Sequence, residues 1–205
     1  MLATRSGSDW VVRAPAKLNL SFEILARRVD GFHEIETLMV SVGLYDSLSL
    51  RSTSTGEVNP SEVTVEWIPA FDRQATASSK AIRPHVEPAD VPACRDNLAV
   101  RAVERLRQRA GLASGAIMRL VKRIPSAAGL GGGSSNAAAA LLAANAAWDL
   151  NWSRGQLAAV AAEIGSDVPF FLSGGAAISA AVRHTVTIRR AAARGGRPIS
   201  RRLSR

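Results

Sequence analysis

Ile124-Pro-Ser-Ala-Ala-Gly-Leu-Gly-Gly-Gly-Ser-Ser-Asn136 is the stretch of the chain from which both the fold and the site can be worked out. Its four glycines, Gly129 and Gly131 to Gly133, remove Cβ atoms where the backbone could approach a ligand closely. A strand is predicted before this loop at 117–121 and an alanine-rich helix after it at 135–148. Free N–H groups and the positive end of the helix dipole favour an anion there, and a triphosphate is the natural ligand.

Other interpretations of the glycine-rich loop fit the sequence less well. A flexible linker has no reason to lie between a strand and a strong helix. The motif G-x-x-x-x-G-K-[ST] requires a lysine that this loop lacks, and a dinucleotide fingerprint requires an acidic residue about 20 positions further on in a βαβ unit. By itself, the loop predicts a phosphate site with Ser134 and Ser135 as hydroxyl donors or metal ligands.

The rest of the chain predicts strands and helices without regular alternation, which favours an α+β class over a doubly wound sheet. With 47% hydrophobic and 21% charged residues, the composition is that of a globular domain. Apolar residues alternate over 18–25, as in a half-buried strand, whereas four prolines in 69–95 predict a long surface insertion. A turn is expected at Asp30-Gly31, an apolar region at 35–50 that ends in a strand at 47–50, and a further strand at 63–67. A helix is expected to begin at 98, with Asp96-Asn97 as its cap, and to end near Gly111. Another helix is expected at 156–164, with Ser153 as its cap and Gly165 as its end.

Two charged residues outside the loop are candidates for catalysis. Lys17 stands at the head of the first alternating strand, two positions before Asn19, so a period of two places both on one face. Asp167 follows a predicted helix and precedes an apolar run, where a carboxylate can be partly desolvated and point into a cleft. The alternatives are a solvated surface lysine and an ordinary turn-forming aspartate.

Together with the loop, several stretches occur in the order that is characteristic of one enzyme family. They are PAKLNL (15–20), DGFHEIETLM (30–39), DNL (96–98), IPSAAGLGGGSSNAAAAL (124–141) and GSDVPFFLSGGAA (165–177). On these stretches the chain resembles the GHMP kinases, and DGFHE with the triple glycine resembles the branch that serves the non-mevalonate route to isoprenoids. The resemblance implies an ATP-binding α+β domain of the ribosomal-protein-like type at 1–177, which in the family precedes a ferredoxin-like C-terminal domain.

The resemblance also implies a reaction. ATP would phosphorylate the 2-hydroxyl of the erythritol part of 4-diphosphocytidyl-methylerythritol, with Mg²⁺ as the accompanying metal. Asp167 would accept the hydroxyl proton, and Lys17 would stabilise charge at the reacting oxygen. Ser135 would help to bind Mg²⁺.

The resemblance further implies where the two substrates bind. The acceptor would contact Asn19, Phe32 and His33, and Phe32 stands where many members have tyrosine, so it can still stack on cytosine. Asp96-Asn97 could help to form the nucleotide pocket, although helix capping explains this pair equally well. ATP would lie against Pro125, Ser126, Ala127, Ala128, Gly129, Leu130, Gly131, Gly132, Gly133, Ser134 and Ser135.

The C-terminal part of the chain departs from the family. The resemblance ends after Ala177, so the ferredoxin-like domain is expected to be largely absent. Residues 168–205 contain eight arginines and no acidic residue, which accounts for most of the net charge of +9. We expect 178–205 to be an Arg-rich tail that is disordered or translated out of frame, with an apolar interface left exposed, which leaves open whether the truncated chain is active.

The sequence also predicts a location and a set of partners. The N-terminus has no apolar signal segment and the most apolar stretch, 137–148, is too short to span a bilayer, so a cytoplasmic protein without membrane contact is expected. The expected partners are ATP and the small alcohol, not nucleic acid, because residues 1–167 hold 18 basic and 17 acidic residues. The alternatives are another GHMP kinase for a different alcohol, a non-catalytic nucleotide-binding fragment, and a nucleic-acid binder that uses the tail.

Overall fold

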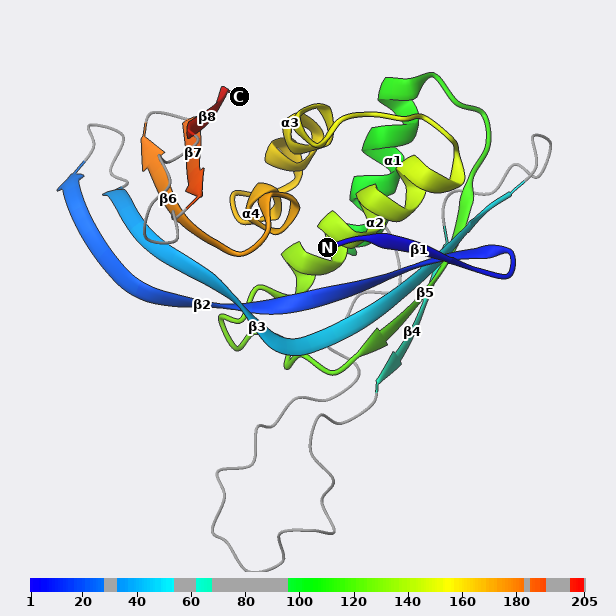
Figure 1. Ribbon diagram of the computed structural model, residues 1–205, viewed down its shortest axis with the longest axis horizontal. Helices are drawn as coiled ribbons and strands as arrows, with labels where there is room; N and C mark the ends of the chain where they lie inside the picture. Colours follow the sequence, from blue (N-terminus) through cyan, green and yellow to red (C-terminus); the bar gives the residue numbers. More distant parts are fainter. Residues whose placement is uncertain (28–32, 54–61, 68–95, 183–184, 191–199, 205) are drawn as a thin grey trace, which may run out of the picture.

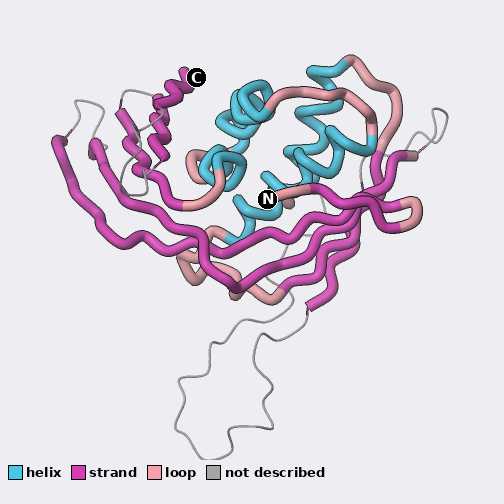
Figure 2. Tube along the Cα trace, viewed as in Figure 1, coloured by secondary structure: helices cyan, strands magenta, loops and turns pink. Residues whose placement is uncertain are grey.

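One layer of strands and one layer of helices make up the described part of the molecule. The computed structural model describes residues 1–27, 33–53, 62–67, 96–182, 185–190 and 200–204. The helices lie on the concave face of a curved sheet (Figure 1), and Figure 2 shows them gathered on that side. The strands are β1 (Ala3–Ser6), β2 (Asp9–Arg27), β3 (His33–Ser52), β4 (Glu62–Trp67), β5 (Ala116–Lys122), β6 (Ala176–Val182), β7 (Thr185–Arg190) and β8 (Ser200–Ser204). The helices are α1 (Leu98–Ala110), α2 (Gly132–Ala147), α3 (Arg154–Ile164) and α4 (Val168–Ser173). This arrangement confirms the predicted α+β class.

The sheet is built around β2 and β3, which pair antiparallel from Trp10 opposite Leu50 to Arg27 opposite His33. Register shifts interrupt the pairing at three places, and such bulges bend a strand and increase its twist. The two strands therefore curve around the helices (Figure 1). The periodicity of the sequence predicts only part of each strand, because every bulge shifts the alternation of inward and outward side chains by one residue.

Two strands pair with different parts of the same edge of β3, and the gap between them is where the glycine-rich loop leaves the sheet. Residues 47–52 pair antiparallel with β5, and residues 35–40 pair antiparallel with β6. β4 pairs parallel with the far side of β5. Since β5 ends at Lys122, the chain departs from the sheet beside residues 41–46 of β3, between the two pairings.

The helices α1, α2 and α3 form close to their predicted positions. The side chain of Asn97 caps α1 by accepting a 2.9 Å hydrogen bond from the N–H of Ala99, and α1 ends at Gly111 in the left-handed conformation. A capping box opens α3, as its sequence indicates. Helix α2 begins at Gly132, three residues before the predicted start, because packing overrides the low helix propensity of glycine there.

The apolar run after Asp167 forms α4, a helix that the sequence periodicity does not predict because it is only six residues long. Pro169 fits its first turn, where a missing N–H costs nothing. Phe170 and Phe171 are buried, with ring centroids 5.0 Å apart in an edge-to-face contact. Helix α4 therefore anchors in the core the segment that carries Asp167.

The core lies between the sheet and the helices, with α2 at its centre. Ala137 to Ala140 are all 0% exposed, and small side chains on every side let α2 approach both α1 and β2. Leu48 of β3 and Leu141 of α2 are among the largest fully buried side chains. Within the described residues, none of the helices is long and apolar enough to cross a membrane.

Residues beyond Ala177 are not a disordered tail where the structure describes them. β6 pairs with β3, β7 pairs with β6, and β8 pairs with β7, all antiparallel. A free edge of β3 offers unpaired N–H and C=O groups to an extended segment, so pairing there does not require periodic side chains. The expected boundary at 177/178 falls inside β6, and translation out of frame stays a prediction.

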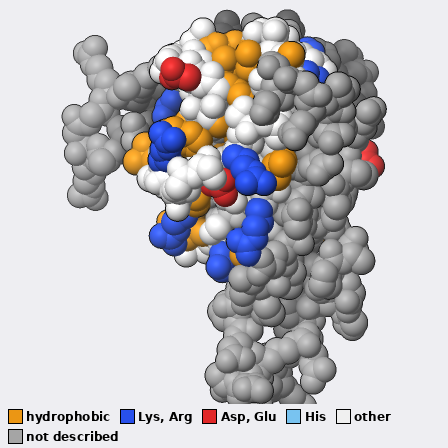
Figure 3. Space-filling view, turned by 90° about the vertical axis from the view of Figure 1, so that its right-hand side faces the viewer, with side chains coloured by type: hydrophobic (Ala, Val, Ile, Leu, Met, Phe, Trp, Pro, Cys, Tyr) orange, Lys and Arg blue, Asp and Glu red, His pale blue; other side chains and the backbone are white. Residues whose placement is uncertain are grey.

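The described surface combines charged and apolar side chains. Figure 3 shows one face on which Lys and Arg side chains lie among acidic and apolar ones. On β2, beyond Lys17, Leu18 is 43% exposed, while Leu20 and Ile24 are both 61% exposed. These exposed apolar side chains lie on one strand, and the exposure of an interface that another domain would cover stays a prediction.

The central position of α2 leads to a first prediction. Replacing Ala139 with leucine inserts a larger side chain into a site with no free space and should lower the free energy of unfolding by about 1–3 kcal/mol. The matched control is Ala159→Leu on the exposed face of α3, which should change it by less than about 0.5 kcal/mol. Urea unfolding followed by circular dichroism measures both, and equal losses would contradict the described packing.

Candidate active site

The glycine-rich loop connects β5 to α2 and passes across β3. β5 lies on one side of β3, whereas Leu130 O accepts a 2.9 Å hydrogen bond from the backbone N–H of Lys17 in β2, on the other side. Gly131 is the N-cap residue of α2 with a φ of 69°, which glycine adopts without strain. Ala127 has a φ of 57°, a conformation that costs a non-glycine residue roughly 1–3 kcal/mol. The surrounding contacts must therefore hold the loop in this shape.

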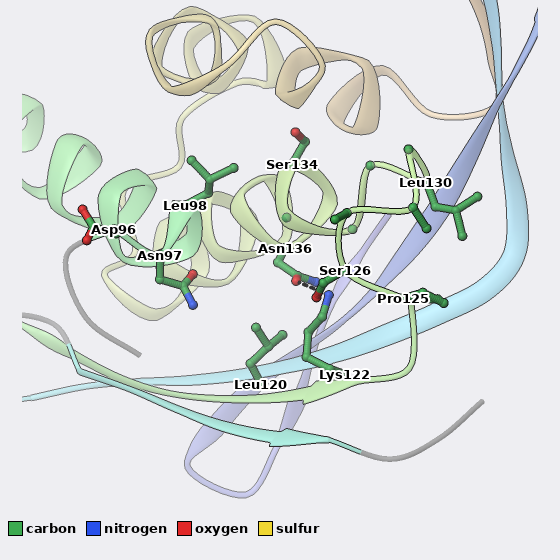
Figure 4. A pocket seen from close by; sticks show the side chains of 16 residues that line it. Asp96, Asn97, Leu98, Leu120, Lys122, Pro125, Ser126, Leu130, Ser134 and Asn136 are labelled. Carbon is green, nitrogen blue, oxygen red and sulfur yellow. Dashed lines mark hydrogen bonds between the residues drawn. The ribbon is translucent and has the colours of Figure 1, made fainter. Parts of the chain in front are cut away.

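A cavity of about 350 Å³ lies between the loop and the start of α1 (Figure 4). The residues that line it are Asp96, Asn97, Leu98, Leu120, Lys122, Pro125, Ser126, Ala127, Ala128, Gly129, Leu130, Gly131, Gly132, Gly133, Ser134 and Asn136. All the predicted ATP-binding residues are among them except Ser135, which is fully buried in α2. The cavity opens at the N-terminus of α2, where backbone N–H groups are free to bind an anion.

The Asp96-Asn97 pair lies both at the start of α1 and at the wall of the cavity, and a role in nucleotide binding stays a prediction. Asn97 caps α1 through its side chain, and the same residue lines the cavity together with Asp96 and Leu98. Figure 4 shows the three residues across the cavity from the glycine-rich loop. Capping and pocket formation are therefore not alternatives, because the helix that Asn97 starts is also the wall of the cavity.

Lys17 lies at the mouth of the loop with its ammonium group held between two oxygen atoms. Its side chain is only 7% exposed, and Nζ lies 3.5 Å from Oδ2 of Asp167. Nζ also donates a 2.9 Å hydrogen bond to Oδ1 of Asn19, two residues along the same strand face. The structure thus brings together Lys17, Asn19 and Asp167, which the sequence places up to 150 positions apart.

The position of Asp167 follows from the two ends of α4. Asp167 is the N-cap residue of this helix, but its side chain makes no capping hydrogen bond and is 36% exposed, so its carboxylate is available to Lys17. At the other end, Arg154 of α3 donates a 2.6 Å hydrogen bond to Leu172 O. The buried phenylalanines of α4 and this contact with α3 fix the carboxylate at the mouth of the loop.

The loop packs directly on Lys17 and α4 at Gly131. A Cβ added to Gly131 would lie 2.9 Å from Cγ of Lys17 and 3.0 Å from Cζ of Phe171, which is closer than carbon atoms can approach. No side chain fits at this position without moving one of these neighbours. The absence of a Cβ therefore allows the glycine-rich loop to touch Lys17 and the helix that follows Asp167.

The remaining predicted site residues are not placed at this mouth. Phe32 lies outside the described residues. His33 opens β3 opposite Arg27, far along the curved strand pair from Lys17, and its side chain is not among the described ones. Ser135 is fully buried, and its Oγ has no hydrogen-bond partner within the described part of the chain.

A second, buried group of polar residues that is not among the predicted site residues lies beneath the loop. Asp46 of β3, Lys122 of β5 and Asn136 of α2 are 0%, 3% and 2% exposed and are linked to one another by hydrogen bonds. Two signals in the sequence could have indicated them. Asp46 is the single charge in the apolar run 37–50, and Lys122 is one of only three lysines in the chain.

The assembled site can bind and stabilise negative charge and can accept a proton. The backbone N–H groups at the start of α2 are positive groups beside the cavity, and Lys17, whose stem packs against Gly131, adds an ammonium group next to the loop, although neither Lys17 nor Asp167 lines the cavity. Asp167 offers a partly exposed carboxylate oxygen beside that ammonium. Such a set is suited to the transfer of an anionic group to a hydroxyl, with the carboxylate as proton acceptor.

Comparisons with known proteins agree with this geometry. Residues 97–175 match the family model of the GHMP kinases N terminal domain. A 4-diphosphocytidyl-2-C-methyl-D-erythritol kinase of Prochlorococcus marinus (strain MIT 9313) is 41% identical over 165 residues, which is 80% of this chain and 44% of the relative. The enzyme of the same name from Pelotomaculum thermopropionicum is 41% identical over 166 residues, or 81% of this chain and 50% of the relative.

Solved structures show the same fold. A crystal structure of 4-(cytidine 5'-diphospho)-2C-methyl-D-erythritol kinase superposes with a TM-score of 0.60 at 35% identity, covering 84% of this chain and 52% of that chain. A homoserine kinase from Cytophaga hutchinsonii superposes with a TM-score of 0.57 at 17% identity, covering 95% of this chain and 60% of that chain, which is a likeness of fold alone.

Residues 97–175 are therefore similar to the N-terminal domain of the GHMP kinases, and this matched range contains the glycine-rich loop and Asp167 but not Lys17. Over about four fifths of its length, the chain is similar to the 4-diphosphocytidyl-2-C-methyl-D-erythritol kinases. It spans about half the length of these curated relatives.

The close approach at Gly131 can be tested with a matched pair of substitutions. Gly131 and Gly129 have similar positive φ values of 69° and 74°, but a Cβ at Gly129 would meet nothing within 4 Å. Gly131→Ala should therefore lower the free energy of unfolding by about 1–3 kcal/mol more than Gly129→Ala, since only the first adds a steric overlap to the strained backbone. Urea unfolding of the two variants measures the difference, and equal losses would contradict the contact with Lys17 and Phe171.

Proposed function

We propose that this chain carries the ATP-binding part of a kinase that phosphorylates the 2-hydroxyl of 4-diphosphocytidyl-2-C-methyl-D-erythritol, in the cytoplasm, on the non-mevalonate route to isoprenoids. The observation that carries the proposal is the 3.5 Å contact between Lys17 Nζ and Asp167 Oδ2 at the mouth of the glycine-rich loop. The relatives that match 80% or more of the chain are named for this reaction, which supports the choice of acceptor.

The proposed roles follow from what phosphoryl transfer requires. The transferred group must be positioned, its charge neutralised, and the proton of the attacking hydroxyl removed. Of the backbone N–H groups of 129–135 expected to hold the β- and γ-phosphates, that of Ser135 donates a 2.9 Å hydrogen bond to Gly131 O, so those of 129–134 would hold the phosphates. Asp167 would accept the hydroxyl proton, and Lys17 would stabilise the charge that develops on the reacting oxygen.

The acceptor would lie along β2 and β3, away from the nucleotide. Asn19 is hydrogen-bonded to Lys17 and is exposed, so it can contact the acceptor near the reacting hydroxyl. His33 opens β3 at the opposite end of the strand pair, and we assign it to the cytidine end of the acceptor. Phe32 lies outside the described residues, and we assign it to the same end because it precedes His33 in the sequence. A long acceptor that runs along the strand pair from Lys17 would reach His33.

The assignment of Mg²⁺ rests on Ser135. Its buried Oγ lacks a hydrogen-bond partner within the described residues and sits in the first turn of α2, which fits a hydroxyl that pairs with a phosphate oxygen or with Mg²⁺. Mg²⁺, when bound with ATP, neutralises charge on the β- and γ-phosphates. Ser134 lines the cavity and is the second hydroxyl available to the phosphates.

Nucleotide binding is the first test of the proposed function. With Mg²⁺ present, a non-hydrolysable ATP analogue should bind this chain with a dissociation constant in the range of about 1 μM to 1 mM, measured by isothermal titration calorimetry. Gly131→Ala should weaken this binding, because the loop cannot keep its contact with Lys17. Absence of nucleotide binding would contradict the proposal. Salt-sensitive binding of duplex DNA that is lost on deletion of 178–205 would favour a nucleic-acid binder instead.

Catalysis is the second test, and Asp167→Asn is the decisive variant. ADP release on addition of 4-diphosphocytidyl-2-C-methyl-D-erythritol is measured with this chain and with a fusion that supplies the remaining half of the Pelotomaculum relative. In whichever form turns over, Asp167→Asn should lower kcat by about 10²–10⁴-fold without changing the affinity for the ATP analogue.

The control for this substitution is Asp149→Asn, the same change at an exposed turn away from the site, which should leave kcat unchanged. If Asp167→Asn keeps its full kcat, Asp167 is not the proton acceptor. If the fusion binds ATP but phosphorylates another small alcohol in preference, the chain is a different GHMP kinase. A fusion that binds ATP and phosphorylates nothing would favour a non-catalytic nucleotide binder.

A further inference from the structure

Asp46 lies at the point where the glycine-rich loop leaves the sheet. Ser47 of β3 pairs with Val121 of β5, and this is the last pair of their ladder. Among the residues that the structure describes, the chain beyond β5 has no strand partner, so its N–H groups need other acceptors. Asp46 is the next residue of β3 at this edge, and its side chain is fully buried.

The carboxylate of Asp46 takes over the hydrogen bonds that the ladder no longer provides. Its Oδ1 accepts hydrogen bonds of 2.7 Å from the N–H of Arg123 and 2.8 Å from the N–H of Ile124. These are the first residues after β5 and lead directly into the loop. Two charge-assisted hydrogen bonds on one oxygen thus hold the entrance of the loop.

The other carboxylate oxygen of Asp46 is bound to the far end of the loop. Oδ2 accepts a 2.9 Å hydrogen bond from Nδ2 of Asn136 in α2 and pairs with Nζ of Lys122. Nζ of Lys122 also donates a 3.0 Å hydrogen bond to Oδ1 of Asn136, drawn as a dashed line in Figure 4. The three side chains therefore form a closed triangle of hydrogen bonds beneath the loop.

Lys122 also packs against Gly132, the first residue of α2. A Cβ on Gly132 would lie 3.1 Å from Nζ of Lys122 and 3.1 Å from Cγ2 of Ile124. The start of α2 thus packs on Lys122 of the triangle and on Ile124 in the segment that leads from β5 into the loop. Because the positions where the loop begins and ends touch the same carboxylate, any shift of Asp46 moves both.

We propose that Asp46, through Lys122 and Asn136, is the positioning residue that fixes the glycine-rich loop in its phosphate-binding shape. A buried ion pair is weak evidence for stability, since its desolvation cost offsets its attraction. A fully satisfied buried polar network does, however, select one arrangement of the elements it joins. Asp46 does not line the cavity, whereas Lys122 and Asn136 do, so hydrogen exchange of the nucleotide-free loop is the readout that separates positioning from direct contact with the ligand. The effect of the network on nucleotide binding rests on the proposed function.

Two variants separate positioning from stability. Asp46→Asn keeps the shape but turns an amide toward the ammonium group of Lys122, whereas Asn136→Ala removes the link to α2 and leaves the ion pair intact. The control is Glu163→Gln, which breaks the surface ion pairs of α3 with Arg105 and Arg109 of α1. Should Asp46→Asn fail to fold, Asn136→Ala carries the test, because alanine is a better helix former than asparagine.

Hydrogen exchange of the nucleotide-free chain is the first measurement. Amides of 123–135 should exchange about tenfold faster in both variants than in the unmodified chain, with amides of α3 unchanged. The second measurement is the dissociation constant of the ATP analogue with Mg²⁺, which should rise by about 10- to 100-fold in both. Glu163→Gln should change neither quantity in the loop.

Each result decides the proposal. Unchanged exchange in the loop, or acceleration that is equal in the loop and in α3, would overturn it and leave the network a contributor to stability alone. Faster exchange confined to the loop with an unchanged dissociation constant would also overturn it. If the unmodified chain binds no nucleotide, the proposed function fails, while exchange in the loop still shows whether Asp46 holds its shape.

Discussion

The contact of Gly131 with Lys17 and Phe171 is the constraint on which the rest of the site depends. It joins the loop to β2 and to α4, two elements that are more than 100 residues apart in the chain. Because no Cβ fits there, the anion-binding end of α2 can lie against the stem of the lysine whose ammonium group faces Asp167. The long paired strands bring Lys17 to this place, and the buried phenylalanines of α4 bring Asp167.

A loop with a strained residue and several glycines needs contacts that hold its conformation, and residues of the sheet strands β2, β3 and β5 make these contacts. Leu130 O accepts a hydrogen bond from β2, and the N–H groups of the first two residues after β5 donate to Asp46. The start of α2 packs against Lys122. Each tie leaves the N–H groups at the start of α2 free. The backbone is thus fixed by its carbonyl groups and by its flanks, and its donors remain available to a phosphate.

The parts of this account that the sequence predicts are those with a local signal. The caps of α1 and α3, the strand β5 and the glycine-rich loop all have residue patterns that span fewer than about 20 positions, as does the parallel strand β4. The pairing of Lys17 with Asp167 could be predicted only through the resemblance to a family, since neither residue alone differs from a surface charge. Helix α4 cannot be predicted from the sequence pattern, because six residues are too few to show a helical period.

Long-range features leave little local trace in the sequence. Asp46 contacts residues 76 to 90 positions away, and nothing near it specifies which partners it meets. The alternation of apolar and polar residues does not predict the full length of β2 and β3, because each bulge reverses which side chains face inward. The strands after Ala177 add to the edge of β3 through backbone groups, so the arginine-rich composition of that segment does not indicate them.

The central claim is that the loop, Lys17 and Asp167 form one phosphoryl-transfer site. The most direct measurement is a crystal structure of this chain with a non-hydrolysable ATP analogue and Mg²⁺. The account predicts that the N–H groups of 129–134 hold the β- and γ-phosphates and that the γ-phosphate faces the gap between Lys17 and Asp167. A triphosphate that points away from this pair, or that lies outside the loop, would contradict it.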